Sequence, residues 1–496
     1  MSHRSPTADI LHRSRLLPFR PLLLLTATCL LAACGMFDST CSAAEKVFRA
    51  GAYAQDITPP EFPISMNGGM SDRQAKGAND PLHARCLVLD DGRNQVAIVV
   101  CDCCAIYREV FDEAKKLATE ATGIPADHML MSATHTHSAP TVVSAFQSDP
   151  DKNYQKFLAA RIAQGIQKAV EQLVPAKIGW GVGKNSQQVF NRRWKMKPGK
   201  FAKSPFGGDE LVKMNPGFLS PEIAEPAGPV DPDVSILAVQ SRDGRPIGLL
   251  ANYSLHYVGG TPPDVVSADY FAAFAERIGQ LIGAGKGEPA FVGIMSNGTS
   301  GDINNNNYSQ GAPDKQPPMG QIKLVADSVA RTALAAYKEI VYHDYVPLVM
   351  REKEIELGVR RPTEDELLKA TQILEAAKAP VLKTQPEVYA RETVLLHDYA
   401  AKVKIKLQGL RIGDLGICAI PCETFVEIGL AIKKQSPMKP TFTIELANGY
   451  NGYLPTPEQH KLGGYETWRA RSSYLEVDAA TKIQATVLEL LQAVAE

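Results

Sequence analysis

The chain has 496 residues, of which 45% are hydrophobic and 22% are charged, the composition of a globular protein with room for one large or two medium domains. Its formal net charge at pH 7 is -1, and it contains no long run of Lys or Arg. Because nucleic-acid-binding proteins need a basic surface, we do not expect a nucleic-acid partner.

The first 44 residues are expected to be an export leader with its linker, which leaves 45–496 as the folded domain. Basic residues precede an apolar stretch at 21–33, which is shorter than the ~20 apolar residues that span a bilayer, so a signal is favoured over a retained membrane helix. Residues 31–34 (LAAC) resemble a lipoprotein box, and residues 42–44 (SAA) resemble an ordinary cleavage site. We favour the first, which predicts a bacterial periplasmic or outer-membrane protein attached through lipidated Cys34. The second predicts secretion.

From Phe48 onward, short apolar runs alternate with amphipathic stretches, which is typical of an α/β fold. The expected elements, in chain order, are strands at 86–89 and 96–100, a helix at 110–122, a strand at 128–133, a helix at 154–173, strands at 178–182, 236–240 and 248–253, a helix at 271–281, strands at 290–296, 403–410, 417–420 and 441–447, and a helix at 479–494. We therefore predict mixed sheet layers flanked by helices.

Two regions depart from this pattern. Residues 195–229 are rich in Pro, Gly and Lys with little periodicity, and they predict a long surface loop near a binding face. A helical insertion is expected at about 360–395. Its helix begins with the capping box of Thr363 and Glu366 and runs to Lys378.

Six cysteines lie in the body of the chain, and Cys101, Cys103 and Cys104 are almost consecutive. They continue the expected strand at 96–100 and lack paired C-x-x-C spacing, so buried thiols are favoured over a metal cluster. An exported protein would also permit disulfides.

Two histidines, His135 and His137, follow the expected strand at 128–133. On a strand, residues two apart share a face, and the carboxyl ends of strands in open α/β sheets border the usual ligand site. A lone histidine is more often a structural hydrogen-bonding residue than a ligand, so the pair needs partners.

Candidate partners lie where other strands meet loops. His256 follows the strand at 248–253, Glu423 follows the strand at 417–420, and Tyr450 and Tyr453 occupy a Gly/Asn-rich loop. Each alone has a structural explanation, since a Glu favours a helix N-terminus and loop tyrosines pack over turns. Together they fit zinc, which accepts His and carboxylate ligands and keeps one position open for a catalytic water. No compact motif such as H-E-x-x-H supports this.

Residues 133–140 (ATHTHSAP) resemble the ATHTHSGP signature of the neutral, non-lysosomal ceramidases. Further similarities follow in that family's order at residues 50–59, 80–85, 252–256, 296–306, 421–423 and 450–465. The resemblance implies the ceramidase catalytic fold and a zinc-dependent hydrolase that cleaves an N-acyl bond of a lipid or small-molecule substrate. It implies zinc ligands at His135, His256, Glu423 and Tyr453. It implies that the catalytic residues contacting the amide are His137, Arg192 and Tyr465, with Arg193 as the competitor of Arg192.

One departure affects the expected substrate. The family's GDVSPN loop reads GDINNN at 301–306, so Asn304 replaces the family's serine, and Asn304 and Asp302 become the substrate-binding candidates. The chain ends soon after the tyrosine loop, so we expect no C-terminal immunoglobulin-like domain. The substrate is therefore not fixed as ceramide. A polar, carbohydrate-derived or ester substrate and a non-catalytic binding protein are the alternatives.

Overall fold

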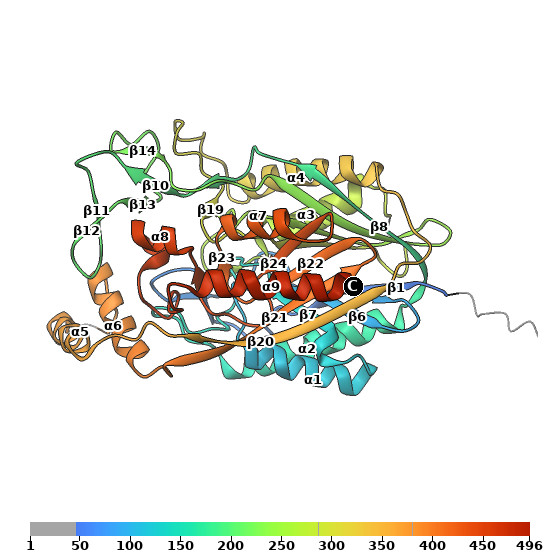
Figure 1. Ribbon diagram of the computed structural model, residues 1–496, viewed down its shortest axis with the longest axis horizontal. Coiled ribbons are helices and arrows are strands. Elements are labelled where there is room, and N and C mark those ends of the chain that lie inside the picture. The colour runs from blue at the N-terminus through green and yellow to red at the C-terminus, as the bar shows by residue number, and fades with distance from the viewer. Residues whose placement is uncertain (1–45, 286, 379) are drawn as a thin grey trace, which may run out of the picture. The chain divides into compact units, whose positions relative to one another are not determined.

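Two large β-sheets packed face to face form the centre of the fold (Figure 1). The computed structural model describes residues 46–285, 287–378 and 380–496. The expected leader, with Cys34 and both candidate processing sites, lies outside these residues. In the described part of the chain, no helix combines the length and the apolar character that a bilayer span requires.

The first sheet has eight strands in the order β18-β16-β15-β8-β1-β5-β6-β7. Their bounds are β1 (Arg49–Asp56), β5 (His83–Asp90), β6 (Gln95–Cys101), β7 (Met129–Ala133), β8 (Val174–Lys184), β15 (Asp233–Ser241), β16 (Pro246–Tyr253) and β18 (Val292–Asn297). The pairs β6–β7 and β16–β18 are parallel, and the other pairs are antiparallel. The outer strands β7 and β18 contact each other, so the sheet curves back on itself.

Four helices cover the outer face of this sheet, with α1 and α2 below the strands and α3 and α4 above them in Figure 1. Their bounds are α1 (Arg108–Thr122), α2 (Lys152–Glu171), α3 (Asp269–Leu281) and α4 (Gly320–Lys338). The alternation along β5 explains the two-sided burial, since Cys86 packs toward the helices and Leu87 toward the second sheet. Helix α1 ends at Gly123, whose φ of 78° is a left-handed conformation that favours glycine.

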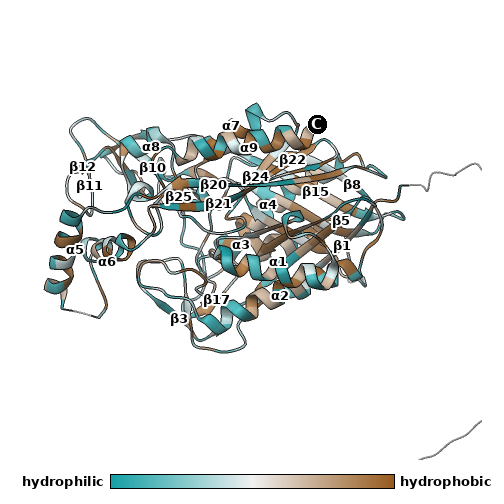
Figure 2. Ribbon diagram, turned by 60° about the horizontal axis from the view of Figure 1, so that its bottom comes forward, coloured by the Kyte–Doolittle hydropathy of each residue, from teal (hydrophilic) through white to brown (hydrophobic). Residues whose placement is uncertain are grey.

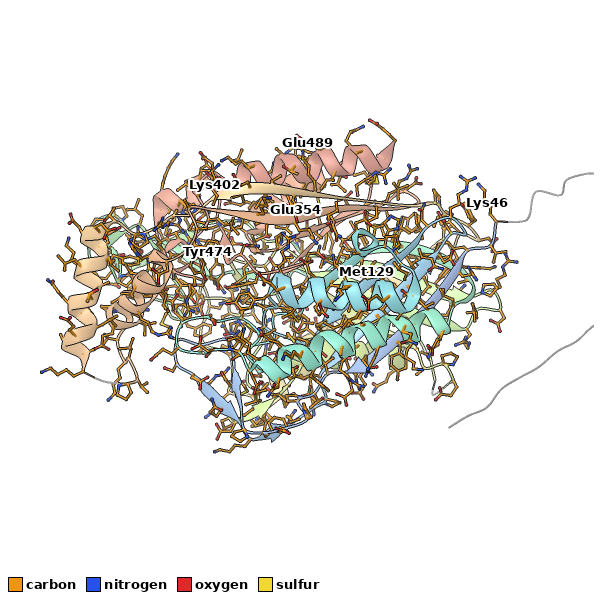
Figure 3. All side chains as sticks on the ribbon, turned by 90° about the horizontal axis from the view of Figure 1, so that it is seen from below. Lys46, Met129, Glu354, Lys402, Tyr474 and Glu489 are labelled. Atoms are coloured by element: carbon orange, nitrogen blue, oxygen red, sulfur yellow. The ribbon has the colours of Figure 1, made fainter. Side chains whose placement is uncertain are left out.

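The second sheet has the order β20-β21-β22-β24 and packs on the inner face of the first. Its strands are β20 (Leu348–Gly358), β21 (Lys402–Ile412), β22 (Leu415–Ile420) and β24 (Thr441–Glu445), and its covering helices are α7 (Val426–Gln435) and α9 (Ala479–Ala495). Hydrophobic residues (brown in Figure 2) concentrate on these central strands. Figure 3 shows α1 and α2 from below, together with Glu354 of β20 and Glu489 of α9. The predicted α/β class, with mixed sheets flanked by helices, is confirmed.

Several short pairs of strands lie near the carboxyl ends of the long strands. They are β2 (Ile64–Met66) with β3 (Arg73–Ala75), β4 (Gly77–Ala78) with β17 (Val265–Val266), β9 (Phe190–Asn191) with β19 (Ile303–Asn304), and β23 (Glu423–Thr424) with β25 (Tyr453–Leu454). The short helix α8 (Pro457–Leu462) follows the last of these. The β23–β25 pair places Glu423 directly beside Tyr453.

The segment at 195–229, predicted as a long surface loop, contains short strands. The segment forms a three-stranded sheet of β10 (Arg193–Met196), β13 (Val212–Met214) and β14 (Ile223–Pro226), and a hairpin of β11 (Ala202–Lys203) and β12 (Asp209–Glu210). These strands have two to four residues, too few for an alternating pattern to be visible in the sequence. Trp194, Ile223 and Tyr308 pack together beneath this sheet.

The insertion near 360–395 contains two helices, α5 (Glu364–Ala377) and α6 (Gln385–His397). The predicted capping box of Thr363 and Glu366 is present at the start of α5. A second capping box, formed by Thr384 and Glu387, starts α6.

Lys115 of α1 gives a test of this packing. Its side chain is 1% exposed, its nearest carboxylate is Glu352 at 3.8 Å, and burial lowers its pKa from 10.5 to about 8. Between pH 8 and 10.5 the unfolded chain holds a proton that the folded chain has lost, so stability rises with pH in that window. We expect Lys115→Met to raise the free energy of unfolding at pH 7 by on the order of 3 kcal/mol and to abolish this rise, as measured by urea unfolding. A rise that persists in the variant would contradict the assignment.

Candidate functional site

Three buried side chains from distant segments meet where strands of the two sheets end. Nε2 of His135 lies 3.0 Å from Nε2 of His256 and 3.2 Å from Oε2 of Glu423. The remaining separation, from His256 Nε2 to Glu423 Oε2, is 3.6 Å. The structure thus brings together three of the four residues that the sequence offered as metal ligands.

The two histidines of the 133–140 segment meet for a different reason than the sequence suggested. Strand β7 ends at Ala133, so His135 and His137 lie beyond it, and the expectation that they share a strand face was wrong. His135 has a φ of 72°, in the left-handed region that costs a non-glycine residue of order 1 kcal/mol. This turn brings Nε2 of His137 to 3.1 Å from Nε2 of His135.

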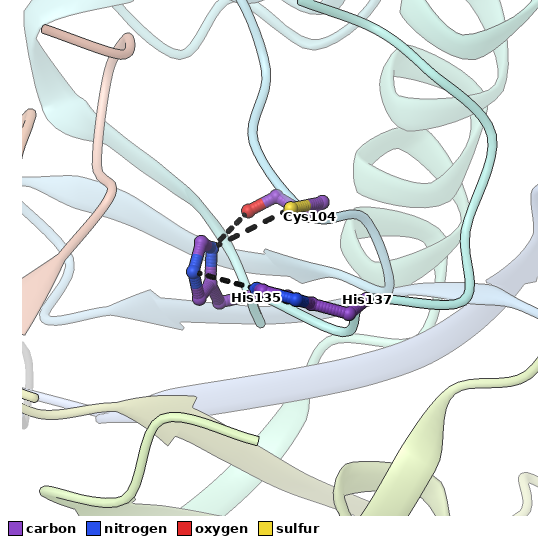
Figure 4. A group of neighbouring side chains, drawn as sticks. All are labelled: Cys104, His135 and His137. Atoms are coloured by element: carbon purple, nitrogen blue, oxygen red, sulfur yellow. Dashed lines mark hydrogen bonds between the residues drawn. The ribbon is translucent and has the colours of Figure 1, made fainter. Parts of the chain in front are cut away.

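Backbone carbonyls fix the tautomers of two of these rings. Nδ1 of His135 lies 2.7 Å from the carbonyl oxygen of Cys104 (Figure 4), and Nδ1 of His256 lies 3.0 Å from that of Ser300. A carbonyl only accepts, so Nδ1 carries the hydrogen in both rings and each Nε2 presents a lone pair. Oε2 of Glu423 faces the same point and has no hydrogen-bond donor among the described residues. Three acceptor atoms that converge in this way fit a cation, and the His and carboxylate donors suit zinc.

The charges around the site suit the same conclusion. Burial, together with the charges of His135 and Arg192, holds the pKa values of His137 and His256 well below the usual range, so both rings are neutral at pH 7. Burial acts to raise the pKa of Glu423, but His135 and neighbouring donors outweigh it and lower that pKa, so the carboxyl group is ionised. Burial acts to lower the pKa of His135, but Cys104 and Glu423 outweigh it and raise that pKa, so this ring carries a proton that a bound metal ion would displace. Neutral imidazoles and an ionised carboxylate are the forms that bind metal.

A buried ion-pair network forms one wall of the site. Nε of Arg192 donates to Glu466 at 2.8 Å, and its Nη2 donates to the hydroxyl of Tyr453 at 3.0 Å. Arg193 donates to the other oxygen of Glu466 at 2.6 Å and turns away toward Gln459. Arg192 is therefore the arginine that faces the cluster, and its catalytic role remains a prediction.

The cluster opens into a small cavity of about 60 Å³. Its lining includes His135, His137, Cys104, Glu423, Tyr450, Tyr453 and Tyr465 as well as Gly68, Val143 and Phe146. Gly68, with a φ of 104°, packs on the ring of His137, where an added Cβ would lie 2.5 Å from that side chain. A second cavity of about 150 Å³ shares Tyr465 and includes Lys203, Lys213 and Gln385 in its lining.

The two substrate-binding candidates lie outside both cavities. Asp302 is buried and accepts from the side chain of Asn191 at 2.7 Å and from the backbone N–H of Val426 at 2.9 Å. Asn304 donates to Asn215 at 2.8 Å. Their assignment as substrate-binding residues remains a prediction.

Tyr450, which the sequence offered as a candidate partner without a role, donates to Oε1 of Glu423 at 2.9 Å. Sequence reasoning missed Cys104. Cys104 lines the cavity, and its Sγ lies 3.7 Å from Nδ1 of His135, which makes Cys104, His135 and His137 a second set of candidate metal donors. The six body cysteines are free and buried, which confirms the prediction of buried thiols for Cys101, Cys103 and Cys104. The parallel pairing of β6 and β7, which end at Cys101 and Ala133, is the signal that places Cys104 near His135.

The chain is similar to known proteins in both sequence and fold. The family profile "Neutral/alkaline non-lysosomal ceramidase, N-terminal" matches residues 48–318. Neutral ceramidase B of Dictyostelium discoideum is 25% identical over 293 residues, which is 56% of this chain and 38% of that protein. Neutral ceramidase A of the same organism is 23% identical over 286 residues, which is 54% of this chain and 37% of that protein. The matched region thus spans just over a third of each relative.

Two solved structures share the fold. The neutral ceramidase from Pseudomonas aeruginosa superposes with a TM-score of 0.68 at 17% identity, covering 90% of this chain and 74% of that one. A ceramidase described as complexed with C2 gives the same score and identity, covering 91% and 76%.

Glu466 provides a test of the buried ion-pair network that forms one wall of the site. It is fully buried between two arginines, and removing its charge leaves both without a counter-ion. Breaking a buried pair in this way costs about 3–5 kcal/mol. We expect Glu466→Gln to lower the free energy of unfolding by that amount in urea titrations at pH 7, and a loss below about 1 kcal/mol would contradict the role of the network.

Proposed function

We propose that this chain, which belongs to the neutral/alkaline non-lysosomal ceramidase family, is a zinc-dependent hydrolase that cleaves an amide (N-acyl) bond. The observation that carries the proposal is the convergence of three lone-pair-bearing atoms, Nε2 of His135, Nε2 of His256 and Oε2 of Glu423. A non-catalytic binding protein would not need this set.

In this proposal His135, His256 and Glu423 hold the metal, and Tyr453 is the fourth ligand. When bound, zinc acts as a Lewis acid and lowers the pKa of water from about 15.7 to about 7. Tyr453 suits this place because β23 and β25 pair it with Glu423.

Amide hydrolysis adds the oxygen of water to the carbonyl carbon, breaks the C–N bond and requires a proton on the leaving nitrogen. His137 is neutral, so its ring can take the proton that water releases and pass it to the leaving amine. Burial raises the pKa of Tyr465, so its hydroxyl stays protonated and can donate to the developing oxyanion. That hydroxyl has no hydrogen-bond partner among the described residues, which leaves it free for the substrate. Arg192 adds a permanent positive charge beside this point.

The size of the cavity favours a short acyl group. A cavity needs at least about 10–15 Å³ to hold one water, so about 60 Å³ has room for a group of a few non-hydrogen atoms. An acetyl or similar group with its amide fits, whereas the long acyl chain of a ceramide needs a longer trench. We therefore propose a short N-acyl substrate and keep ceramide, which the names of the relatives suggest, as the alternative.

A second candidate function, hydrolysis of a polar, carbohydrate-derived or ester substrate, has one observation in its favour. The 150 Å³ cavity beyond Tyr465 is lined in part by Lys203, Lys213 and Gln385, which can hydrogen-bond to a hydroxylated head group. Export with a lipid anchor at Cys34 remains a proposal that rests on residues 31–34.

The metal site can be tested by counting bound zinc. We expect the wild-type protein to bind one zinc and His135→Ala and Glu423→Ala to bind none at stoichiometric concentration, because each removes a buried donor. His397→Ala is the matched control, since His397 also lies near a carboxylate, Glu364 at 3.2 Å, but outside the cluster. Stoichiometric zinc in both cluster variants would reject the assignment.

The acyl pocket can be tested with a series of N-acyl amides of increasing chain length. We expect kcat/KM to fall by about tenfold or more for each methylene beyond the pocket's capacity, since one methylene is worth about 1–3 kcal/mol of discrimination. Phe146→Ala should extend the accepted length, whereas Phe201→Ala, at an exposed site outside the cavity, should not. A wild-type preference for long chains would favour ceramide instead.

A further inference from the structure

A fully buried carboxylate lies behind the candidate metal site without touching it. Glu445 is the last residue of β24, and its side chain has no exposed surface. Its Oε1 accepts from the hydroxyl of Ser300 at 2.6 Å. Its Oε2 accepts from the backbone N–H of Thr424 at 2.7 Å and from that of Ser300 at 3.3 Å.

The two partners of Glu445 are the groups that hold two of the proposed ligands. The carbonyl of Ser300 lies 3.0 Å from Nδ1 of His256 and fixes the orientation of that ring. Thr424 directly follows Glu423, and its carbonyl accepts from the N–H of Gly301 at 2.9 Å. Glu445 thus joins the loop that orients His256 to the segment that carries Glu423.

The residue after Glu445 reaches the third ligand segment. Leu446 has a φ of 52°, which turns the chain sharply at the end of β24. Its carbonyl accepts from the N–H of Ala133 at 3.2 Å, two residues before His135. Two consecutive residues therefore contact all three segments that deliver His135, His256 and Glu423.

The chemistry of this position calls for a polar side chain. Two of the three groups around Glu445 are backbone N–H donors, and the third is a hydroxyl, which can donate or accept. An apolar side chain of similar size would leave both N–H groups unpaired in the interior, which costs about 1–3 kcal/mol each. The carboxyl group of Glu445 therefore ties the Ser300 and Thr424 segments together.

We propose that Glu445 is a positioning residue for the metal site, which sets the separation of His256 and Glu423 through Ser300 and Thr424. The inference rests on the proposed zinc site. Residues behind metal ligands tune affinity in this way, and their loss typically weakens metal binding by about 10–100-fold.

The test compares Glu445→Leu with a matched control, Asp91→Leu. Asp91 is also buried and accepts from three backbone N–H groups, those of Arg93, Asn94 and Leu348, but it lies at the β5–β6 turn, at the other end of the strands. Zinc affinity is measured by competition with a chromophoric chelator, and stability by urea unfolding. We expect both variants to lose stability, and only Glu445→Leu to bind zinc about 10–100-fold more weakly.

A second variant covers the case in which Glu445→Leu does not fold. Ser300→Ala removes the hydroxyl that donates to Glu445 and keeps the carbonyl near His256, so it should also weaken zinc binding. Wild-type zinc affinity in either folded variant, or an equal loss of affinity in Asp91→Leu, would overturn the positioning role. A wild-type protein that binds no zinc would overturn the proposed function and this inference together. Zinc binding by the wild type with unchanged affinity in the variants would overturn this inference alone.

Discussion

The site depends on one electrostatic constraint, the convergence of acceptor atoms from His135, His256 and Glu423 within 3.0–3.6 Å of one another. Two backbone carbonyls hold the histidine tautomers that create it. These atoms repel one another unless a proton or a metal cation lies between them. The curved first sheet and the end of β24 hold them together by bringing three chain segments to one point.

Much of the fold can be predicted from the sequence because its core strands are long apolar runs and its outer helices are amphipathic. The strand at Val96 and the final helix, which buries Ile483 and Leu491, illustrate this. The small sheet around Trp194 was missed because its strands are too short to show a period. Helix α4 and strand β20 were missed as well, and β20 contains four consecutive charged residues, at 351–354, which hide the alternating pattern of a strand.

The candidate ligands were accessible from the sequence only through family resemblance, since His135 and Glu423 are almost three hundred residues apart and no local spacing connects them. The choice between Arg192 and Arg193 was not accessible at all. Neighbouring residues on an extended segment point in opposite directions, and Glu466, from a distant turn, accepts from both. Only the position of Tyr453 on one side decides which guanidinium faces the metal site.

The residues that position the proposed metal ligands are separate from those that line the cavity. Glu445, Ser300 and Thr424 lie behind the cluster, whereas Val143, Phe146 and Tyr465 line the cavity in front of it. The replacement of a serine by Asn304 falls in neither group, because Asn304 is hydrogen-bonded to Asn215, the residue that follows β13. If the proposed function holds, we expect the cavity walls, rather than the 301–306 loop, to set the acyl length.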